Sequence, residues 1–243
     1  IEYTAVAELP MRRAEQRRVQ LVVRLLEGGR TDREELGYDP EQWHLGVIVS
    51  DASLEQAVAR IAARAHAEVL TVAAETSTLW MWIGASSSPV AIRDELAAQD
   101  PAGAATLAIG EPEAGVAGFR QTYRQAQVAA AIGDRLGRSV TRYADVALED
   151  LAATNRERAA EFLDRELGPL GADTREAKTL RETLVAYFTC SQRASSAAAQ
   201  LGVHERTIGN RLRRVEQLTG QPALARALEL QVALRLHDLI VER

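Results

Sequence analysis

Several features that would assign this chain of 243 residues to a common protein class are scarce or missing. Cys190 is the single cysteine, which excludes a disulfide framework and predicts a reducing, cytoplasmic environment. No apolar run approaches the roughly 18 residues of a membrane span, and no signal peptide begins the chain. We therefore expect no membrane partner.

Motifs for metals and nucleotides are also missing. The four histidines, His44, His66, His204 and His237, are scattered and do not have the spacing of metal ligands. The chain contains no phosphate-binding loop of the G-x-x-x-x-G-K-[ST] type. The sequence thus predicts no bound metal and no cofactor.

Lysine is almost absent, because Lys178 is the only one, and arginine carries nearly all the positive charge. The formal net charge of −5 argues against nucleic acid as a partner of the chain as a whole. However, residues 175–243 carry a net charge of +4 and the remainder −9. A GC-rich genome would favour arginine over lysine without clustering it. The guanidinium fork suits phosphates and guanine edges, so this basic segment is a candidate for nucleic-acid binding.

Hydrophobic periodicity divides the chain into an α+β part and a helical part. Residues 12–27 and 53–66 have helical spacing, and residues 44–50 form a β-rich run. Strands over 69–74 and 79–83 are joined by a polar turn at residues 75–78. A helix to residue 98, a strand over 106–109, a loop over 110–118, a helix over 119–136 and a strand over 139–143 follow. The predicted order is β-α-β-β-α-β-α-β, with an antiparallel hairpin in the middle.

The rest of the sequence is predicted to be helical. One or two helices cover residues 149–166, Asp173 is a candidate N-cap for a helix through Phe188, and Pro222 opens a last helix to about Val241. The best domain boundary is at residues 168–173. We expect a connecting helix over 1–30, an α+β domain over 31–148, a helical linker over 149–172 and an all-α domain over 173–243.

The most informative stretch is residues 195–215. Small alanines precede the turn Leu201-Gly202-Val203, and a polar helix follows. Close packing of two helices needs the small residues, and the tight turn needs a glycine because glycine tolerates positive φ. The stretch therefore predicts a helix-turn-helix.

A helical wheel separates two faces of the second helix. Ile208, Leu212, Val215 and Thr219 form an apolar seam, and the opposite face carries Arg206, Asn210, Arg213, Arg214 and Gln217. Arginine and asparagine read guanine and adenine in the major groove, so we assign Arg206, Thr207 and Asn210 to bases. Arg211 and Arg214 are assigned to phosphates. His204 either begins this helix or contacts a phosphate. The competing interpretation is a solvated polar helix face.

These residues carry a family resemblance. Three segments, residues 181–188, 198–208 and 211–220, resemble the C-terminal helix-turn-helix of PucR/CdaR-type bacterial transcription regulators, and residues 229–234 fit the closing helix of that family. The recognition helix also looks like that of Fis-type DNA-binding domains. The PucR/CdaR family commonly has asparagine where this chain has Arg206, so the resemblance implies no base preference at this position.

The predicted α+β part resembles the palm fold of GGDEF domains and the GGDEF-like domain that precedes the helix-turn-helix in CdaR-type regulators. A diguanylate cyclase needs carboxylates for two metal ions and a glycine-rich hairpin. Here the hairpin over residues 76–84 has neither an adjacent glycine pair nor an acidic pair, and Asp51 is a lone carboxylate. We predict a degenerate domain without catalytic residues, in which Trp80 and Trp82 either pack under a helix or line an interface or pocket. The R-x-x-D pattern of Arg142 and Asp145, known from cyclase inhibition sites, is too short to be informative.

Together these observations predict a sequence-specific regulator of transcription that is not an enzyme. The expected partner is double-stranded DNA, bound by a homodimer because pairing doubles a small footprint. The start at Ile1 suggests a fragment or processed form, and the resemblance implies that a small-molecule effector is sensed by a domain upstream. Two alternatives remain open. The α+β domain could sense or cyclise nucleotides, or the chain could be a protein-interaction module.

Overall fold

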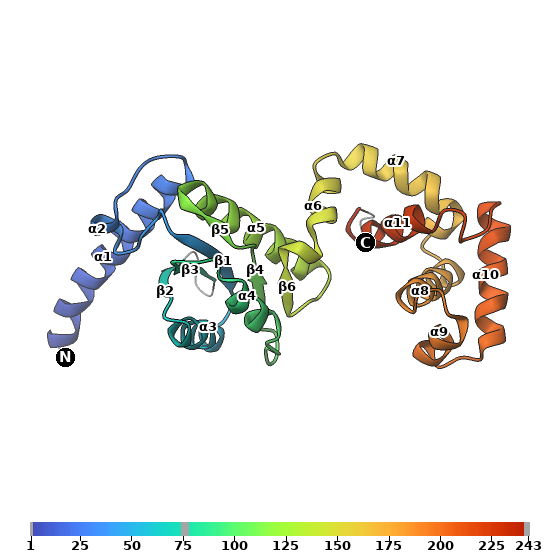
Figure 1. The fold of residues 1–243 in the computed structure, drawn as a ribbon, viewed down its shortest axis with the longest axis horizontal. Coiled ribbons are helices and arrows are strands. Elements are labelled where there is room, and N and C mark those ends of the chain that lie inside the picture. Colours follow the sequence, from blue (N-terminus) through green and yellow to red (C-terminus); the bar gives the residue numbers. More distant parts are fainter. Residues whose placement is uncertain (1, 74–77, 241–243) are drawn as a thin grey trace. The chain divides into compact units, whose positions relative to one another are not determined.

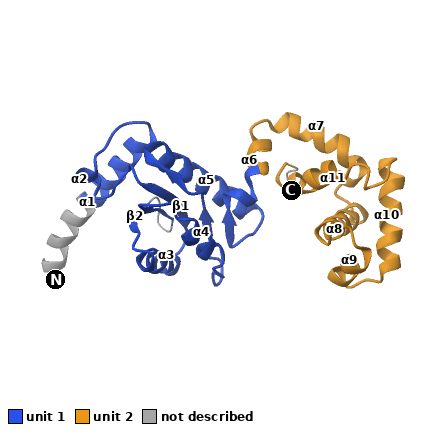
Figure 2. Ribbon diagram, viewed as in Figure 1, with its two compact units in different colours: residues 1–147 blue, residues 148–243 orange. Residues whose placement is uncertain are grey.

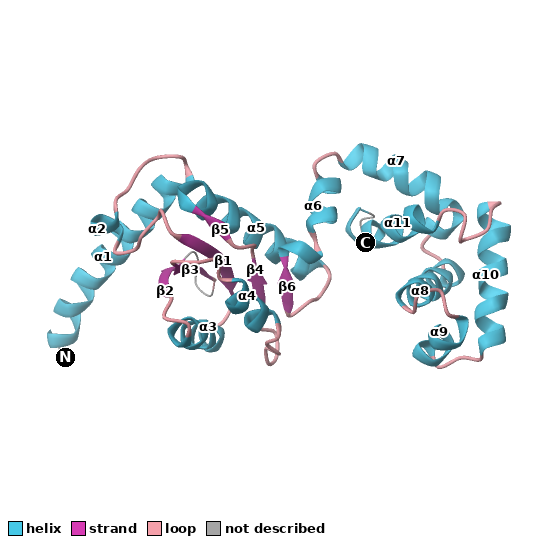
Figure 3. Ribbon diagram, in the orientation of Figure 1, coloured by secondary structure: helices cyan, strands magenta, loops and turns pink. Residues whose placement is uncertain are grey.

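The computed structural model describes residues 2–73 and 78–240, with side chains described from residue 14 onward (Figure 1). The chain divides into two compact units, residues 1–147 and residues 148–243 (Figure 2). The first unit is built around a sheet and the second is helical (Figure 3). The predicted α+β fold class, with a helical C-terminal part, is confirmed.

The sheet of the first unit has the strand order β2-β3-β1-β4-β6, and β5 pairs with the start of β1. Its strands are β1 (Trp43–Val49), β2 (Glu68–Ala73), β3 (Leu79–Ala85), β4 (Leu107–Ile109), β5 (Glu113–Ala114) and β6 (Val140–Arg142). β1 pairs antiparallel with β3 and β4, β2 pairs antiparallel with β3, and β4 pairs parallel with β6. The predicted hairpin is therefore present, although residues 75–77 of its turn lie outside the described residues.

Helices cover both faces of this sheet. α3 (Ala52–Arg64) and α4 (Val90–Ala97) pack on one face, where alternate strand residues such as Val47, Met81 and Ile109 form an apolar core. α5 (Gly115–Arg135) packs on the other face. Because both faces are covered, six of the seven residues of β1 are buried.

Two tryptophans of β3 pack under α5. The Trp82 ring is fully buried and lies parallel to that of Phe119, with ring centroids 4.5 Å apart, while its Nε1 donates to the Phe119 carbonyl at 3.0 Å. Trp80 packs against Tyr123 with ring centroids 5.0 Å apart. Of the two interpretations of these tryptophans, packing under a helix is the one that the geometry supports.

α5 approaches the sheet closely at Thr122. The Gly46 amide donates to Thr122 Oγ1 at 2.7 Å, and a Cβ added at Gly46 would lie 2.8 Å from the Thr122 backbone. A Cβ at Gly110 would lie 2.3 Å from the Thr122 carbonyl oxygen. Side chains at either position would therefore push the helix away from the sheet.

Local predictions were wrong at several places in the first unit. The loop expected over residues 110–118 contains β5, whose pairing with Trp43 and His44 of β1 brings the start of α5 forward to Gly115. α1 spans Glu2–Leu26 and so begins earlier than predicted, and the short helix α2 (Arg33–Leu36) was not predicted. Pairing between distant segments leaves no periodic signal in so short a stretch.

All of the regular structure described in the second unit is helical. It consists of α6 (Ala147–Ala153), α7 (Arg156–Leu167), α8 (Arg175–Thr189), α9 (Ala194–Leu201), α10 (Glu205–Thr219) and α11 (Ala227–Ile240). The 3₁₀ helix η2 (Gly168–Gly171) joins α7 to α8, and another, η1 (Tyr143–Asp145), precedes α6. No described helix is both long and apolar enough to cross a membrane.

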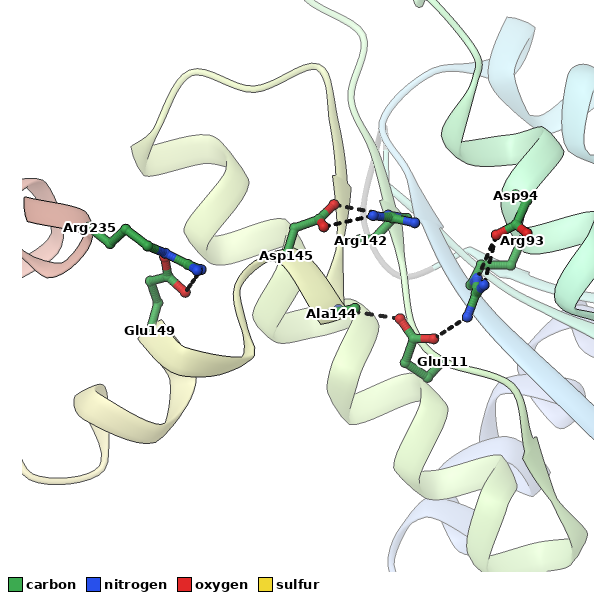
Figure 4. Close-up of polar contacts among 8 residues, drawn as sticks. All are labelled: Arg93, Asp94, Glu111, Arg142, Ala144, Asp145, Glu149 and Arg235. Atoms are coloured by element: carbon green, nitrogen blue, oxygen red, sulfur yellow. Dashed lines mark hydrogen bonds and ion pairs between the residues drawn. The ribbon is translucent and has the colours of Figure 1, made fainter. Parts of the chain in front are cut away.

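The segment expected to be a linker, residues 149–172, is instead part of the second unit. Leu163, Leu167 and Leu170 share a buried core with α8 and α11. The Glu149 carboxylate, almost fully buried, accepts hydrogen bonds from Arg235 Nε at 2.9 Å and Nη2 at 2.8 Å (Figure 4). The division at residues 147/148 thus replaces the boundary predicted at 168–173.

A second buried carboxylate ties α7 to the turn before α11. Glu166 accepts bonds from Arg226 Nε at 2.7 Å and Nη2 at 2.8 Å, and from Arg165 Nε at 2.9 Å. Burial by itself would raise the pKa of Glu166, but these two arginines outweigh it and hold the pKa below its usual value. Its charged form is therefore favoured in the folded state.

Two helix starts also differ from prediction. Thr174 rather than Asp173 caps α8, since its Oγ1 accepts from the Ala177 amide at 3.1 Å. Pro222 does not open the last helix, because a turn closed by the bond from the Ala225 amide to the Pro222 carbonyl precedes α11. This turn places Arg226 beside Glu166.

Candidate nucleic-acid interface

The predicted helix-turn-helix is formed by α9 and α10, with α8 packed against both. Gly202 ends α9 with φ +63°, and the Val203 amide donates to the Ala198 carbonyl at 3.0 Å. The requirement for a glycine with positive φ at this turn is therefore confirmed.

A small core fixes the two helices. Ala186, Ala197, Ala198 and Ile208 are buried together, and methyl-sized side chains let the helices approach closely. Ile208 and Val215 of the predicted apolar seam are fully buried, whereas Leu212 and Thr219 are half-buried.

The opposite face of α10 is open to solvent, as the wheel predicts. Its exposed residues are Arg206, Asn210, Arg213, Arg214 and Gln217. Arg213 Nη2 donates to Asn210 Oδ1 at 2.5 Å, so one cation and one amide lie together on this face. α10 therefore presents an exposed polar face rich in guanidinium groups, while its apolar face packs against α8 and α9.

His204 begins α10. It has extended backbone angles, and its Nδ1 accepts a hydrogen bond from the Arg206 amide at 3.1 Å, as an N-cap side chain does. The geometry supports the first of the two roles considered for this histidine.

The two arginines assigned to phosphates are bonded to α8. Arg211 Nη1 donates to Thr183 Oγ1 at 3.0 Å, and Arg214 Nε donates to Glu176 Oε1 at 2.7 Å. Sequence reasoning missed Thr183 and Glu176. The wheel gives the order of residues around α10 but carries no signal for which flank of the helix meets a neighbour.

A groove with a volume of about 460 Å³ lies between α8 and α10. Seven of its eight lining residues have polar or charged side chains, and three of them are arginines, although much of the surface that they turn to the groove is aliphatic. The lining consists of Arg175, Glu176, Thr179, Leu180, Thr207, Asn210, Arg211 and Arg214. Thr207, which we assigned to bases together with Asn210, is half-buried at this groove. Cationic groups from two helices thus converge beside the exposed face of α10.

The lone carboxylate considered for catalysis in the first unit has a structural role. Asp51 caps α3, since its Oδ1 accepts from the Ser53 amide at 2.7 Å and from the Ser53 hydroxyl at 2.5 Å. These bonds lower its pKa. Among the described side chains, no group of three or more His, Cys, Asp or Glu residues is placed to hold a metal ion.

Arg142 and Asp145, the residues of the R-x-x-D pattern, pair with each other at 2.7 and 2.9 Å (Figure 4). Nearby, Glu111 accepts from Arg93 Nη1 at 2.6 Å and from the Ala144 amide at 3.3 Å. These contacts hold η1 against the loop that follows β4, which is a structural role.

Comparison with protein families agrees with this geometry. Residues 180–236 match the model of the PucR C-terminal helix-turn-helix domain, and residues 30–132 match that of the GGDEF-like domain. The chain carries a GGDEF-like domain and a PucR-type helix-turn-helix domain. The predicted domain composition of a PucR-type transcriptional regulator is therefore confirmed.

Similarity to individual proteins is more restricted. A 71-residue stretch is 34% identical to the transcriptional activator PmfR of Paenarthrobacter nicotinovorans. It covers 29% of this chain and 15% of that protein, so the matched part is a small fraction of that relative. Among solved structures, a regulator of polyketide synthase expression from Bifidobacterium adolescentis aligns over 90% of this chain and 96% of that chain. Its sequence is 18% identical and the TM-score is 0.40.

Proposed function

We propose that the PucR-type domain binds double-stranded DNA and regulates transcription, with α10 lying in the major groove. The observation that carries this proposal is the exposed face of α10, where Arg206, Asn210 and Arg213 project from a helix anchored by a buried seam. Arginine and asparagine are the side chains that make paired hydrogen bonds to guanine and adenine.

Within this surface we assign roles by position. Arg206 and Asn210, with Thr207 beside them, are proposed to contact base edges. Arg211 and Arg214 are proposed to hold phosphates, and Arg213 to support the same face through its bond to Asn210. His204 would contribute by fixing the start of the helix, where the side chains that contact bases begin.

The GGDEF-like domain is proposed to be non-catalytic and to serve dimerisation or signal relay. The sequence of its hairpin has no adjacent glycines and no acidic pair, and Asp51 is engaged as a helix cap. Calorimetry with GTP and with cyclic dinucleotides, in the presence of magnesium, tests this. Binding or turnover of either would favour the alternative of a nucleotide sensor or nucleotide-cyclising enzyme.

A homodimer is proposed because one recognition helix contacts few base pairs, and two-fold pairing doubles the footprint. Light scattering over a range of protein concentrations measures the mass directly. A monomer at the highest concentration would contradict the proposal.

The DNA-binding proposal is tested by fluorescence anisotropy with labelled genomic promoter fragments at several salt concentrations. We expect at least one fragment to bind more tightly than random DNA, with affinity falling as salt rises because phosphate contacts release counterions. Absence of binding, or binding insensitive to salt, would instead favour a protein-interaction module.

A further inference from the structure

Three arginines line the groove between α8 and α10. Arg175 of α8 and Arg211 and Arg214 of α10 line it together with the hydroxyl-bearing residue Thr207, whereas the hydroxyl of Thr179 donates to the Arg175 carbonyl at 2.9 Å. Guanidinium groups present several N–H donors in a planar fork, which suits the oxygens of a phosphate. The lining thus combines three permanent cations with a hydrogen-bonding side chain.

Arg211 is held in place before any ligand arrives. Thr183 is fully buried, and its hydroxyl accepts from Arg211 Nη1 at 3.0 Å while donating to the Thr179 carbonyl at 2.8 Å. This arrangement uses one of the five N–H donors of Arg211. The guanidinium is therefore fixed at the wall of the groove with donors remaining.

Arg214 has a different partner, the carboxylate of Glu176 on α8. The Nε–Oε1 distance is 2.7 Å, a charge-assisted hydrogen bond, and Glu176 is the single acidic residue of the groove lining. Both side chains are about half exposed, at 45% for Arg214 and 58% for Glu176. Ion pairs this exposed contribute little free energy and are readily exchanged.

We propose that this groove binds one phosphodiester of the DNA backbone, and that Glu176 holds Arg214 in the free protein until that phosphate displaces its carboxylate. The inference rests on the proposed function and adds Arg175, Glu176 and Thr183 to the residues that govern DNA binding. Asn210 belongs both to the groove lining and to the exposed face of α10. The bound phosphate is thus the one adjacent to the base pairs read by that face.

The test compares variants of α8 in the full chain by fluorescence anisotropy with two duplexes, one genomic promoter fragment and one of random sequence. Glu176→Gln removes the competing carboxylate, and we expect both duplexes to bind about threefold to fivefold more tightly. Glu182→Gln removes the same charge from an exposed position of α8 outside the groove lining and measures the general electrostatic effect. We expect that effect to be less than about twofold.

Arg175→Gln gives an independent measurement. We expect it to weaken binding of both duplexes about fivefold and to lower the salt slope by up to about 0.9, as the loss of one phosphate contact does. Lys178→Gln, at an exposed cation on the same helix but outside the groove lining, is the matched control. Thermal unfolding of each variant checks that it folds.

These measurements distinguish failure of the phosphate site from failure of the proposed DNA binding. Salt-sensitive DNA binding by the wild type, together with equal effects of Glu176→Gln and Glu182→Gln, or of Arg175→Gln and Lys178→Gln, would overturn this inference and leave the proposed function standing. A wild-type chain that binds neither duplex would overturn both.

Discussion

The guanidinium of Arg211 on α10 donates a hydrogen bond to the buried hydroxyl of Thr183 on α8, 28 positions earlier in the chain. This bond links the helix proposed to read DNA to the helix that supports it. Thr183 also donates to the Thr179 carbonyl, so its hydroxyl is satisfied on both sides. The orientation of an arginine at the surface thereby depends on a residue that no solvent or ligand reaches.

Thr183→Val should remove the hydrogen bond to Arg211 and leave the packing in place, because valine has nearly the same shape as threonine. We expect a loss of about 1 kcal/mol in the free energy of unfolding, typical of one buried hydrogen bond, and DNA binding weakened about threefold at every sequence because Arg211 is no longer held. Thr183→Ser keeps the hydroxyl and should retain most of the affinity. Denaturant unfolding and anisotropy titrations measure the two effects, and equal affinities for the Val and Ser variants would contradict the role of this bond.

Arg206→Ala should relax sequence preference. Arg206 is exposed on the face of α10 that we propose reads bases, and loss of one paired contact to a base costs about 1–3 kcal/mol of discrimination. Arg214→Ala should instead weaken all sequences alike. Competition titrations with single-base variants of a bound fragment measure the difference. If Arg206→Ala weakened binding equally at every sequence, Arg206 would contact a phosphate and not a base.

Acid should destabilise the second unit through Glu166. Since the folded state lowers the pKa of Glu166 below its usual value of 4.5, the charged form stabilises the fold above that pH. The stabilisation is lost as the pH falls from about 4.5 through the lower folded-state pKa. Arg226→Gln should remove most of this stabilisation. We expect the free energy of unfolding at neutral pH to fall by about 2 kcal/mol and not more, because Arg165 remains as a partner of Glu166. Denaturant unfolding at several pH values measures both, with Arg165→Gln, at a more exposed arginine, as the milder control.

Two glycine substitutions should change stability in opposite directions. Gly46→Ala places a Cβ 2.8 Å from the backbone of Thr122 and should destabilise the first unit by about 1–3 kcal/mol. Gly209 lies inside α10, and a Cβ there would have nothing within 4 Å. Gly209→Ala should therefore stabilise the chain by up to about 1 kcal/mol, the difference in helix propensity. Thermal unfolding measures both changes, and a neutral Gly46→Ala would show that α5 can shift away from the sheet.

Sequence patterns predicted the features that depend on neighbouring residues. Alternation and helical spacing located five of the six strands and the long helices, and the Leu-Gly-Val sequence located the turn at Gly202. The seam of Ile208 and Val215 is buried as the wheel predicts. These features depend on residues that are close together in the sequence.

What the sequence did not reveal depends on contacts between distant residues. Glu149 and Arg235 are 86 positions apart, and Glu166 and Arg226 are 60 apart, so the sequence indicated only a helical linker over residues 149–172. For the same reason the partners of Arg211 and Arg214 on α8 were not foreseen. A charged residue in a sequence gives no indication of whether it faces water or an opposite charge.

The pairing of Arg214 with Glu176 has a consequence for the search of a genome. A chromosome offers on the order of 10⁶–10⁹ incorrect sites, so a regulator is limited by how much of it is held on them. A cation that already has an acidic partner gains less binding free energy from an arbitrary stretch of DNA than a solvated cation would. Arg206 and Asn210, the residues proposed to read bases, would then supply a larger share of the total affinity, and less protein would be held on incorrect sites.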